Sequence, residues 1–134
     1  MNYEEALKIA TDAHKGQFRK ISGKEYITHP IAVASKFEDE RHKKVAIFHD
    51  VPEDTKITLN DLRNYGLEEE LINAVDILTH KDNQSYLDYI LLCKSTEITK
   101  SIKIEDLKHN LSDNPLSKCS EDKYLMALYI INKD

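Results

Sequence analysis

The stretch KKVAIFHDVPEDT, residues 43–55, joins an apolar run to a cluster of ionisable side chains. Val45–Phe48 are consecutive apolar residues, which indicates a buried core element. His49 and Asp50 follow at once, so this pair lies where the core meets a cleft. Adjacent helical residues point about 100° apart, so the two can reach one ion only beside the helix flank. We expect a helix over 43–51 that ends near the following proline.

Helical spacing of apolar residues recurs along the rest of the chain. Only three Gly and three Pro occur, which suits helices joined by tight loops. Thr58 and Asp61 form a capping box at one helix start, and Asn114-Pro115 predicts a break. Further helices are expected over 3–14, from 29 onward, and over 58–64, 67–79, 85–93, 96–111 and 120–131. We therefore predict an all-α, single-domain helical bundle over residues 1–134.

The composition excludes several classes of protein. Hydrophobic residues make up 40% and charged residues 32%, with a formal net charge of −5. This net charge argues against a nucleic-acid partner. A small anionic substrate can still bind if a metal ion and a few Lys or Arg side chains make the inside of a cleft positive. No apolar run is long enough for a membrane span and no signal peptide is seen, so we expect a cytoplasmic protein. Cys93 and Cys119 are expected to be reduced thiols.

A carboxylate interrupts an apolar ridge on the helix expected over 96–111. Ile98, Ile102, Asp106 and Asn110 are spaced four apart, so they share one helix face. A carboxylate that continues a core stripe needs a compensating partner, because burial of an unpaired charge is very unfavourable. A lysine or a metal ion could be this partner. Alternatively, Asp106 could lie on a solvent-facing turn of the helix.

Two imidazoles and two carboxylates are candidate ligands of one divalent transition metal, with positions left open for water and phosphate. They are His29, His49, Asp50 and Asp106. Taken alone, His29 would also suit a helix cap or a packed core position. We interpret His14 as structural and expect His42 and His80 to be solvated. His109 either has a structural role or turns toward the site.

Ionisable residues on either side of these candidates suit acid–base chemistry and anion binding. Glu53 and Asp54 follow the His49-Asp50 pair closely. They could belong to a helix terminus or a turn, or they could orient or deprotonate a water, or protonate a leaving oxygen. Arg19 and Lys20 lie in the loop before His29. A basic pair of this kind is often only solvated, but Arg and Lys are also the side chains that bind phosphate.

These motifs, in this order, resemble the HD-domain metal-dependent phosphohydrolases, and more narrowly the hydrolase domain of the RelA/SpoT family and its stand-alone small alarmone hydrolases. The resemblance rests on AHKGQFRKISGKEYITHP at 13–30, HDVPEDT at 49–55 and a later KIxDxxHN at 103–110. It covers roughly residues 1–115. Pro52 departs from the aliphatic residue usual in the family, which leaves the aim of Glu53 and Asp54 open.

The resemblance implies an HD-type helical bundle that binds Mn²⁺, or another divalent transition metal, through the four candidate ligands. It implies Glu53 and Asp54 as the pair that activates the attacking water. It also implies a substrate-binding set that consists of Arg19, Lys20, Ser22, Tyr26, Lys103 and Asn110. The reaction implied is removal of the 3′-pyrophosphate from guanosine tetra- or pentaphosphate. Two alternatives stay open, namely a phosphohydrolase of another small nucleotide and a non-catalytic regulatory module, and so does the oligomeric state.

Overall fold

The computed structural model describes residues 1–112 and 116–134 of the chain. Within these residues the secondary structure consists of nine α-helices, and the β-type pairing is limited to an isolated bridge between Phe18 and Glu25. The all-α prediction is therefore confirmed. The expected break at Asn114-Pro115 lies outside the described residues.

Several helices begin where the sequence supplies side chains that accept hydrogen bonds from the first turn. Thr58 and Asp61 form the predicted capping box, while Ser85 and Thr96 cap the two helices that follow them. Helices α1 to α9 span Tyr3–Ala13, Thr28–Ala34, Glu40–Phe48, Val51–Asp54, Leu59–Asn64, Glu69–Leu78, Tyr86–Lys94, Glu97–Leu111 and Lys118–Asn132. Most expected bounds are thus close to the observed ones.

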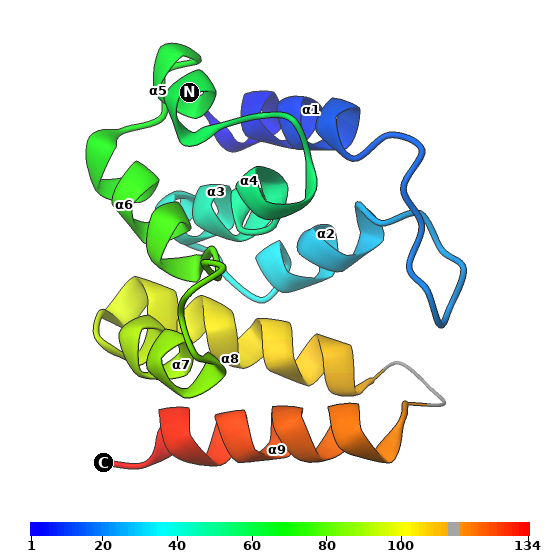
Figure 1. Cartoon of the computed structure of the whole chain (residues 1–134). Coiled ribbons are helices and arrows are strands. Elements are labelled where there is room, and N and C mark those ends of the chain that lie inside the picture. Colours follow the sequence, from blue (N-terminus) through cyan, green and yellow to red (C-terminus); the bar gives the residue numbers. More distant parts are fainter. Residues whose placement is uncertain (113–115) are drawn as a thin grey trace.

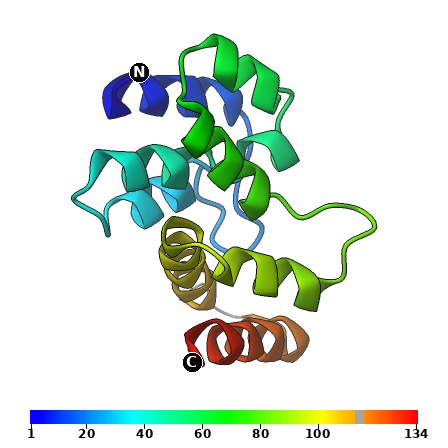
Figure 2. The same ribbon diagram turned by 90° about the vertical axis from the view of Figure 1, so that its left-hand side faces the viewer.

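The helices lie in tiers. In Figure 1, α1 lies above α2 and α3, α8 runs beneath these two, and α9 lies at the base; Figure 2 shows α7 beside α8 and α9. Val45–Phe48 are completely buried in the middle of this stack, as the sequence predicted. Helix α3 therefore lies in the core between the upper and lower tiers.

Among the described residues, none of the helices is long and apolar enough to cross a membrane.

The chain breaks its helix earlier than expected at the His49-Asp50 pair. Helix α3 ends at Phe48, with His49 as its C-cap, and α4 begins at Val51, with Asp50 as its N-cap. Pro52 lies in the first turn of α4, where its missing N–H has no helical partner to lose. The prediction that one helix runs to Val51 is therefore wrong, because this proline begins a new helix. Both polar side chains lie at the junction.

Candidate active site

Four side chains from three parts of the fold meet inside the molecule. His29 comes from α2, His49 and Asp50 from the α3–α4 junction, and Asp106 from α8. Each offers one nitrogen or oxygen atom, and these four atoms all lie within 4.8 Å of one another. His29, His49 and Asp106 are buried. The structure thus brings together all four residues that the sequence suggested as metal ligands.

The distances within this group suit a shared ion. Asp106 Oδ1 lies 2.8 Å from His29 Nε2 and 3.1 Å from His49 Nε2. Asp50 Oδ2 lies 3.2 Å from His49 Nε2 and 3.6 Å from His29 Nε2. Donors about 2.1 Å from one ion lie roughly 3.0–3.4 Å apart at common coordination angles. The two nitrogens and two oxygens therefore need little movement to bind a divalent cation.

His49 gives a chemical reason to expect a cation here. Its Nδ1 lies 2.5 Å from the carbonyl oxygen of Ala46, which can only accept, so Nδ1 carries a proton and donates it. A neutral His49 would then direct the lone pair of Nε2 at two carboxylates. Burial lowers the pKa of His49, but the negative charge of Asp50 and the hydrogen bond to Asp106 raise it well above its usual value. The repulsion between the Nε2 lone pair and the two carboxylates is removed either by protonation of the imidazole or by a metal ion bound between them.

His109 holds the second ring nitrogen of His29. The two Nδ1 atoms lie 2.7 Å apart and the rings stack with their centroids 4.9 Å apart. One Nδ1 must donate and the other accept. If Nε2 of His29 binds a metal, its Nδ1 carries the proton and donates to His109, an arrangement that orients a ligating imidazole. Of the two roles left open for His109, the structure favours the one that turns toward the site.

Asp106 is oriented through both of its oxygens. Lys103 Nζ donates to Oδ2 at 2.8 Å, and Asn110 Nδ2 lies 3.5 Å from Oδ1. Burial opposes ionisation of Asp106, yet the Lys103 ammonium and the two histidines hold its pKa well below the usual value. Burial likewise opposes the charge on Lys103, but Asp106 raises the pKa of that lysine well above its ordinary range. The pair stays ionised at neutral pH.

Tyr26 links Asp50 to Asp54. Its phenol donates to Asp50 Oδ2 at 2.6 Å and lies 3.4 Å from Asp54 Oδ2. Partial burial of the carboxyl group and the charges of Asp50 and Glu53 raise the pKa of Asp54 to about 6. Asp54 does not line the cavity, and its carboxylate is linked to that of Asp50 through the Tyr26 hydroxyl.

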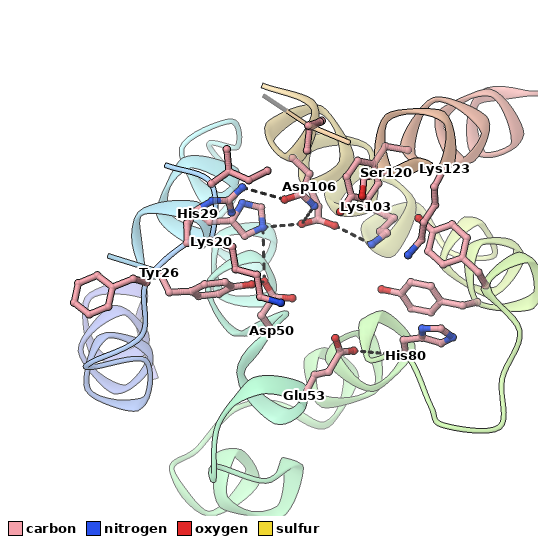
Figure 3. A pocket seen from close by; sticks show the side chains of 18 residues that line it. Lys20, Tyr26, His29, Asp50, Glu53, His80, Lys103, Asp106, Ser120 and Lys123 are labelled. Carbon is pink, nitrogen blue, oxygen red and sulfur yellow. Dashed lines mark hydrogen bonds and ion pairs between the residues drawn. The ribbon is translucent and has the colours of Figure 1, made fainter. Parts of the chain in front are cut away.

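A cavity of about 560 Å³ is lined by three of the four central side chains, His29, Asp50 and Asp106. Figure 3 shows Lys20, Tyr26 and Asp50 on one side of it and Ser120 and Lys123 on the other, with Lys103 and Asp106 between them. Among the described residues that line it, four are Arg or Lys and three are Asp or Glu, so a divalent ion would make this part of the wall clearly positive. An acidic protein therefore carries a cavity suited to an anion.

The predicted catalytic and binding residues differ in how closely they approach this cavity. Glu53 lines it, and its Oε1 accepts the backbone N–H of His80 at 2.9 Å. Arg19 is buried in the wall, where its Nη2 donates to Asn110 Oδ1 at 3.2 Å. The remaining predicted residues on the wall are Lys20, Tyr26, Lys103 and Asn110.

Ser22 is the predicted binding residue that lies away from the cavity. It is exposed in the loop before α2, and its Oγ accepts a hydrogen bond from the backbone N–H of Lys24 at 3.3 Å. This contact tightens the loop on itself. Ser22 therefore supports the conformation of the loop here, while its neighbours Lys20 and Arg19 reach the wall.

The sequence did not indicate the part of the cavity wall that α7 and α9 form. Tyr86 and Tyr89 come from α7, and Ser120, Lys123 and Tyr124 from α9. His80, expected to be solvated, is half-buried there and stacks on Tyr89 with a centroid separation of 4.8 Å. Helical spacing marked these residues only as parts of amphipathic helices. Their shared wall depends on how α7 packs against α9.

Proteins of known function resemble this chain in sequence, although no family model matches it. A guanosine-3′,5′-bis(diphosphate) 3′-pyrophosphohydrolase of Haemophilus influenzae is 37% identical over 117 residues, which cover 77% of this chain and 17% of that protein. The bifunctional (p)ppGpp synthase/hydrolase SpoT of Escherichia coli strain K12 is 34% identical over 121 residues, with 80% and 17% covered. The chain thus spans about a sixth of the length of these curated relatives.

A solved structure resembles the whole fold. It is described as a metazoan ortholog of SpoT that hydrolyzes ppGpp and plays a role in starvation responses. It matches with a TM-score of 0.77 and 24% sequence identity, over 96% of this chain and 82% of that one. This likeness confirms the type of helical bundle that the sequence motifs implied.

Proposed function

The chain belongs to the RelA/SpoT-type HD hydrolase domains, and we propose that it removes the 3′-pyrophosphate from guanosine tetra- or pentaphosphate. Water attacks the phosphorus that is bonded to the ribose 3′-oxygen, and the bond between that phosphorus and the 3′-oxygen breaks. The products are pyrophosphate and either GDP or GTP. The convergence of His29, His49, Asp50 and Asp106 beside a cation-rich cavity carries this proposal. In it, residues 1–134 act as one hydrolase domain in the cytoplasm.

The four central side chains hold the cofactor in this proposal. Mn²⁺, or another divalent transition-metal ion, supplies two things when bound there: it lowers the pKa of water and offsets negative charge on phosphoryl oxygens. His29 Nε2 and His49 Nε2 are the nitrogen ligands. Lys103 and Tyr26 each hold one carboxylate of the set, Asp106 and Asp50, so the ligands are oriented before substrate arrives.

Glu53 is the proton acceptor that we assign to the attacking water. The backbone N–H of His80 fixes Oε1, which leaves Oε2 to accept a proton inside the cavity. Asp54, the other member of the predicted catalytic pair, acts through Tyr26 and thereby positions Asp50. The pair thus divides into one residue that faces the substrate and one that faces the ligand set.

Arg19 and Lys20 bind phosphate oxygens on the wall formed by the loop before α2. The Arg19 side chain is preorganised by its contact with Asn110, so little side-chain entropy is lost when an anion binds. Lys20 is exposed and supplies a second positive charge. Together they keep the scissile group beside the central ligands.

The experiment is a product analysis with metal-loaded protein. Guanosine tetraphosphate is incubated with the Mn²⁺-loaded chain, and the products are separated as pyrophosphate, orthophosphate, GDP and guanosine. We expect equal amounts of pyrophosphate and GDP, with none formed by the Asp106→Asn variant. Glu105→Gln is the matched control, because this neighbour on α8 pairs with Lys108 outside the cavity and should keep full activity.

Two results would overturn the proposal. Orthophosphate released from another small nucleotide, with guanosine tetraphosphate untouched, would mean a different phosphohydrolase. Metal binding without hydrolysis of any nucleotide in a panel would mean a regulatory module. The same assay with Mg²⁺, Mn²⁺, Fe²⁺ or Zn²⁺ as the added metal identifies the ion that supports turnover.

A further inference from the structure

We propose that the wall formed by α7 and α9 is a second anion-binding subsite, which holds the 5′-diphosphate of the nucleotide while its 3′-pyrophosphate lies at the four central ligands. The donors of this subsite are the Lys123 ammonium and the Tyr86 phenol, and Ser120 lies beside them on the same wall. The proposal rests on the proposed function for the identity of the nucleotide, but it concerns a separate part of the cavity.

The Tyr86 hydroxyl is a hydrogen-bond donor that awaits a partner. It is buried, and no described residue hydrogen-bonds to it. Burial raises the pKa of this phenol more than the nearby Lys103 ammonium lowers it. The Tyr86 phenol therefore keeps its proton at neutral pH. A buried hydroxyl without a partner is unfavourable, and such groups in native proteins usually have a ligand or water to bond. A phosphate oxygen would satisfy it.

Lys123 supplies a positive charge at the same place. Its Nζ lies 4.3 Å from the centre of the Tyr86 ring, so the two side chains form one unit across α7 and α9. Within the described residues, no carboxylate lies within ion-pair distance of Lys123. By contrast, Lys103 is already bound to Asp106 and Arg19 to Asn110. Lys123 therefore has its charge available for a ligand.

The position of Lys123 suits a nucleotide that carries charge at both ends. Figure 3 shows Lys20 and Lys123 on opposite sides of the cavity, with Asp106 between them. A nucleoside with diphosphates on both its 3′ and 5′ oxygens presents two separate clusters of negative charge. One cluster reaches the central ligands and the Arg19 side, and the other reaches Lys123. The wall would therefore favour nucleotides phosphorylated at both positions.

The test compares two substrates that differ only at the 5′ end. One is guanosine 5′-diphosphate 3′-diphosphate and the other is guanosine 3′-diphosphate with a free 5′-hydroxyl. For Lys123→Gln we expect KM for the first to rise about tenfold, as for a lost charge-assisted hydrogen bond, with kcat nearly unchanged. KM for the second should stay the same. Tyr86→Phe should show the same selectivity with a smaller rise.

Lys133→Gln is the matched control, since Lys133 also lies over a tyrosine ring, that of Tyr129, but outside the cavity. It should leave both KM values unchanged. If Lys123→Gln weakens both substrates equally, or neither, the second subsite is wrong while the proposed function stands.

If the wild-type chain hydrolyses neither substrate, the proposed function fails, and calorimetry with GDP and guanosine then decides the subsite alone. We expect GDP to bind Lys123→Gln about tenfold more weakly than wild type, and guanosine to bind both alike. Equal GDP affinity in wild type and Lys123→Gln would overturn the subsite.

Discussion

The two sides of the cavity differ in how completely their polar groups are bonded. On the side of α2, α4 and α8, Asp106 contacts two histidines and a lysine, and Asp50 accepts from Tyr26. On the side of α7 and α9, the Tyr86 hydroxyl is buried without a partner among the described residues. The first side is held in place before any substrate arrives, whereas the second can be completed by a ligand.

This difference separates chemistry from recognition. Groups that bind an ion or move a proton must be held closely in position, because small displacements are costly in rate. Groups that select a substrate gain most when their partners are absent from the free protein, because the substrate then supplies the missing bonds. Substitutions of the groups that bind the ion or accept the proton should therefore reduce kcat, and substitutions of Tyr86 and Lys123 should change KM.

Asp106→Asn should have the largest effect of these substitutions, because it alters the carboxylate that contacts both histidines and Lys103. The amide carries no charge for a cation and would leave the Lys103 ammonium buried without its partner. We expect loss of measurable hydrolysis and of tight Mn²⁺ binding. Calorimetric Mn²⁺ titration beside the hydrolysis assay checks both, with Glu105→Gln as the control. Retention of wild-type Mn²⁺ affinity would show that Asp106 is no ligand.

Glu53→Gln should separate metal binding from turnover. The amide can still contact the His80 N–H through its oxygen, but it cannot take a proton from water. We expect kcat to fall by about 10²–10⁴ with Mn²⁺ affinity unchanged. Glu70→Gln, on an exposed glutamate of α6 that pairs with Arg41, provides the control. Full activity of the Glu53 variant would remove the proton-acceptor role.

Lys103→Met should lower the free energy of unfolding of the metal-free protein by about 3–5 kcal/mol, because it leaves the buried Asp106 carboxylate without its lysine partner. Saturating Mn²⁺ should reduce this loss, since the ion offsets the same carboxylate. Urea denaturation with and without Mn²⁺ measures both values. Lys108→Met, at an exposed pair with Glu105, should cost about 0–1 kcal/mol. Equal losses for the two lysines would contradict the assignment.

Asp54→Asn should have the smallest effect and a distinct pH dependence. The folded pKa of Asp54, about 6, lies above its ordinary value, so its charge opposes folding above pH 6 and this cost disappears as the pH falls toward 4. The variant should therefore gain on the order of 1 kcal/mol at pH 7.5, after allowance for solvent screening, and nothing near pH 4. Thermal melts of metal-free protein follow the gain, and a pH-independent gain would contradict it.

On the side of α2, α4 and α8, the candidate ligands His49, Asp50 and Asp106 could be predicted from the sequence because each of them stands out against its immediate neighbours in the chain. The His49-Asp50 pair follows a run of core residues, and Asp106 interrupts an apolar ridge. Ionisable side chains at buried positions need a compensating partner, and the sequence alone does not show which residues or ions provide it. The structure supplies that partner by bringing α2, the α3–α4 junction and α8 together.

The other side could not be predicted from the sequence for a physical reason. Tyr86 and Lys123 are ordinary residues of amphipathic helices, and only the packing of α7 on α9 joins them. The helix start next to Pro52 is hard to predict for a related reason. A proline disfavours helix before it yet suits the first turn of the next helix, so local sequence alone does not say which of the two applies.

The most direct measurement is a crystal structure of the Mn²⁺-soaked protein with anomalous data collected at the manganese edge. We expect one anomalous peak between His29 Nε2, His49 Nε2, Asp50 Oδ2 and Asp106 Oδ1, within about 2.0–2.3 Å of each. A peak elsewhere, or none with the four side chains still in contact, would contradict the claim that these residues form a metal centre.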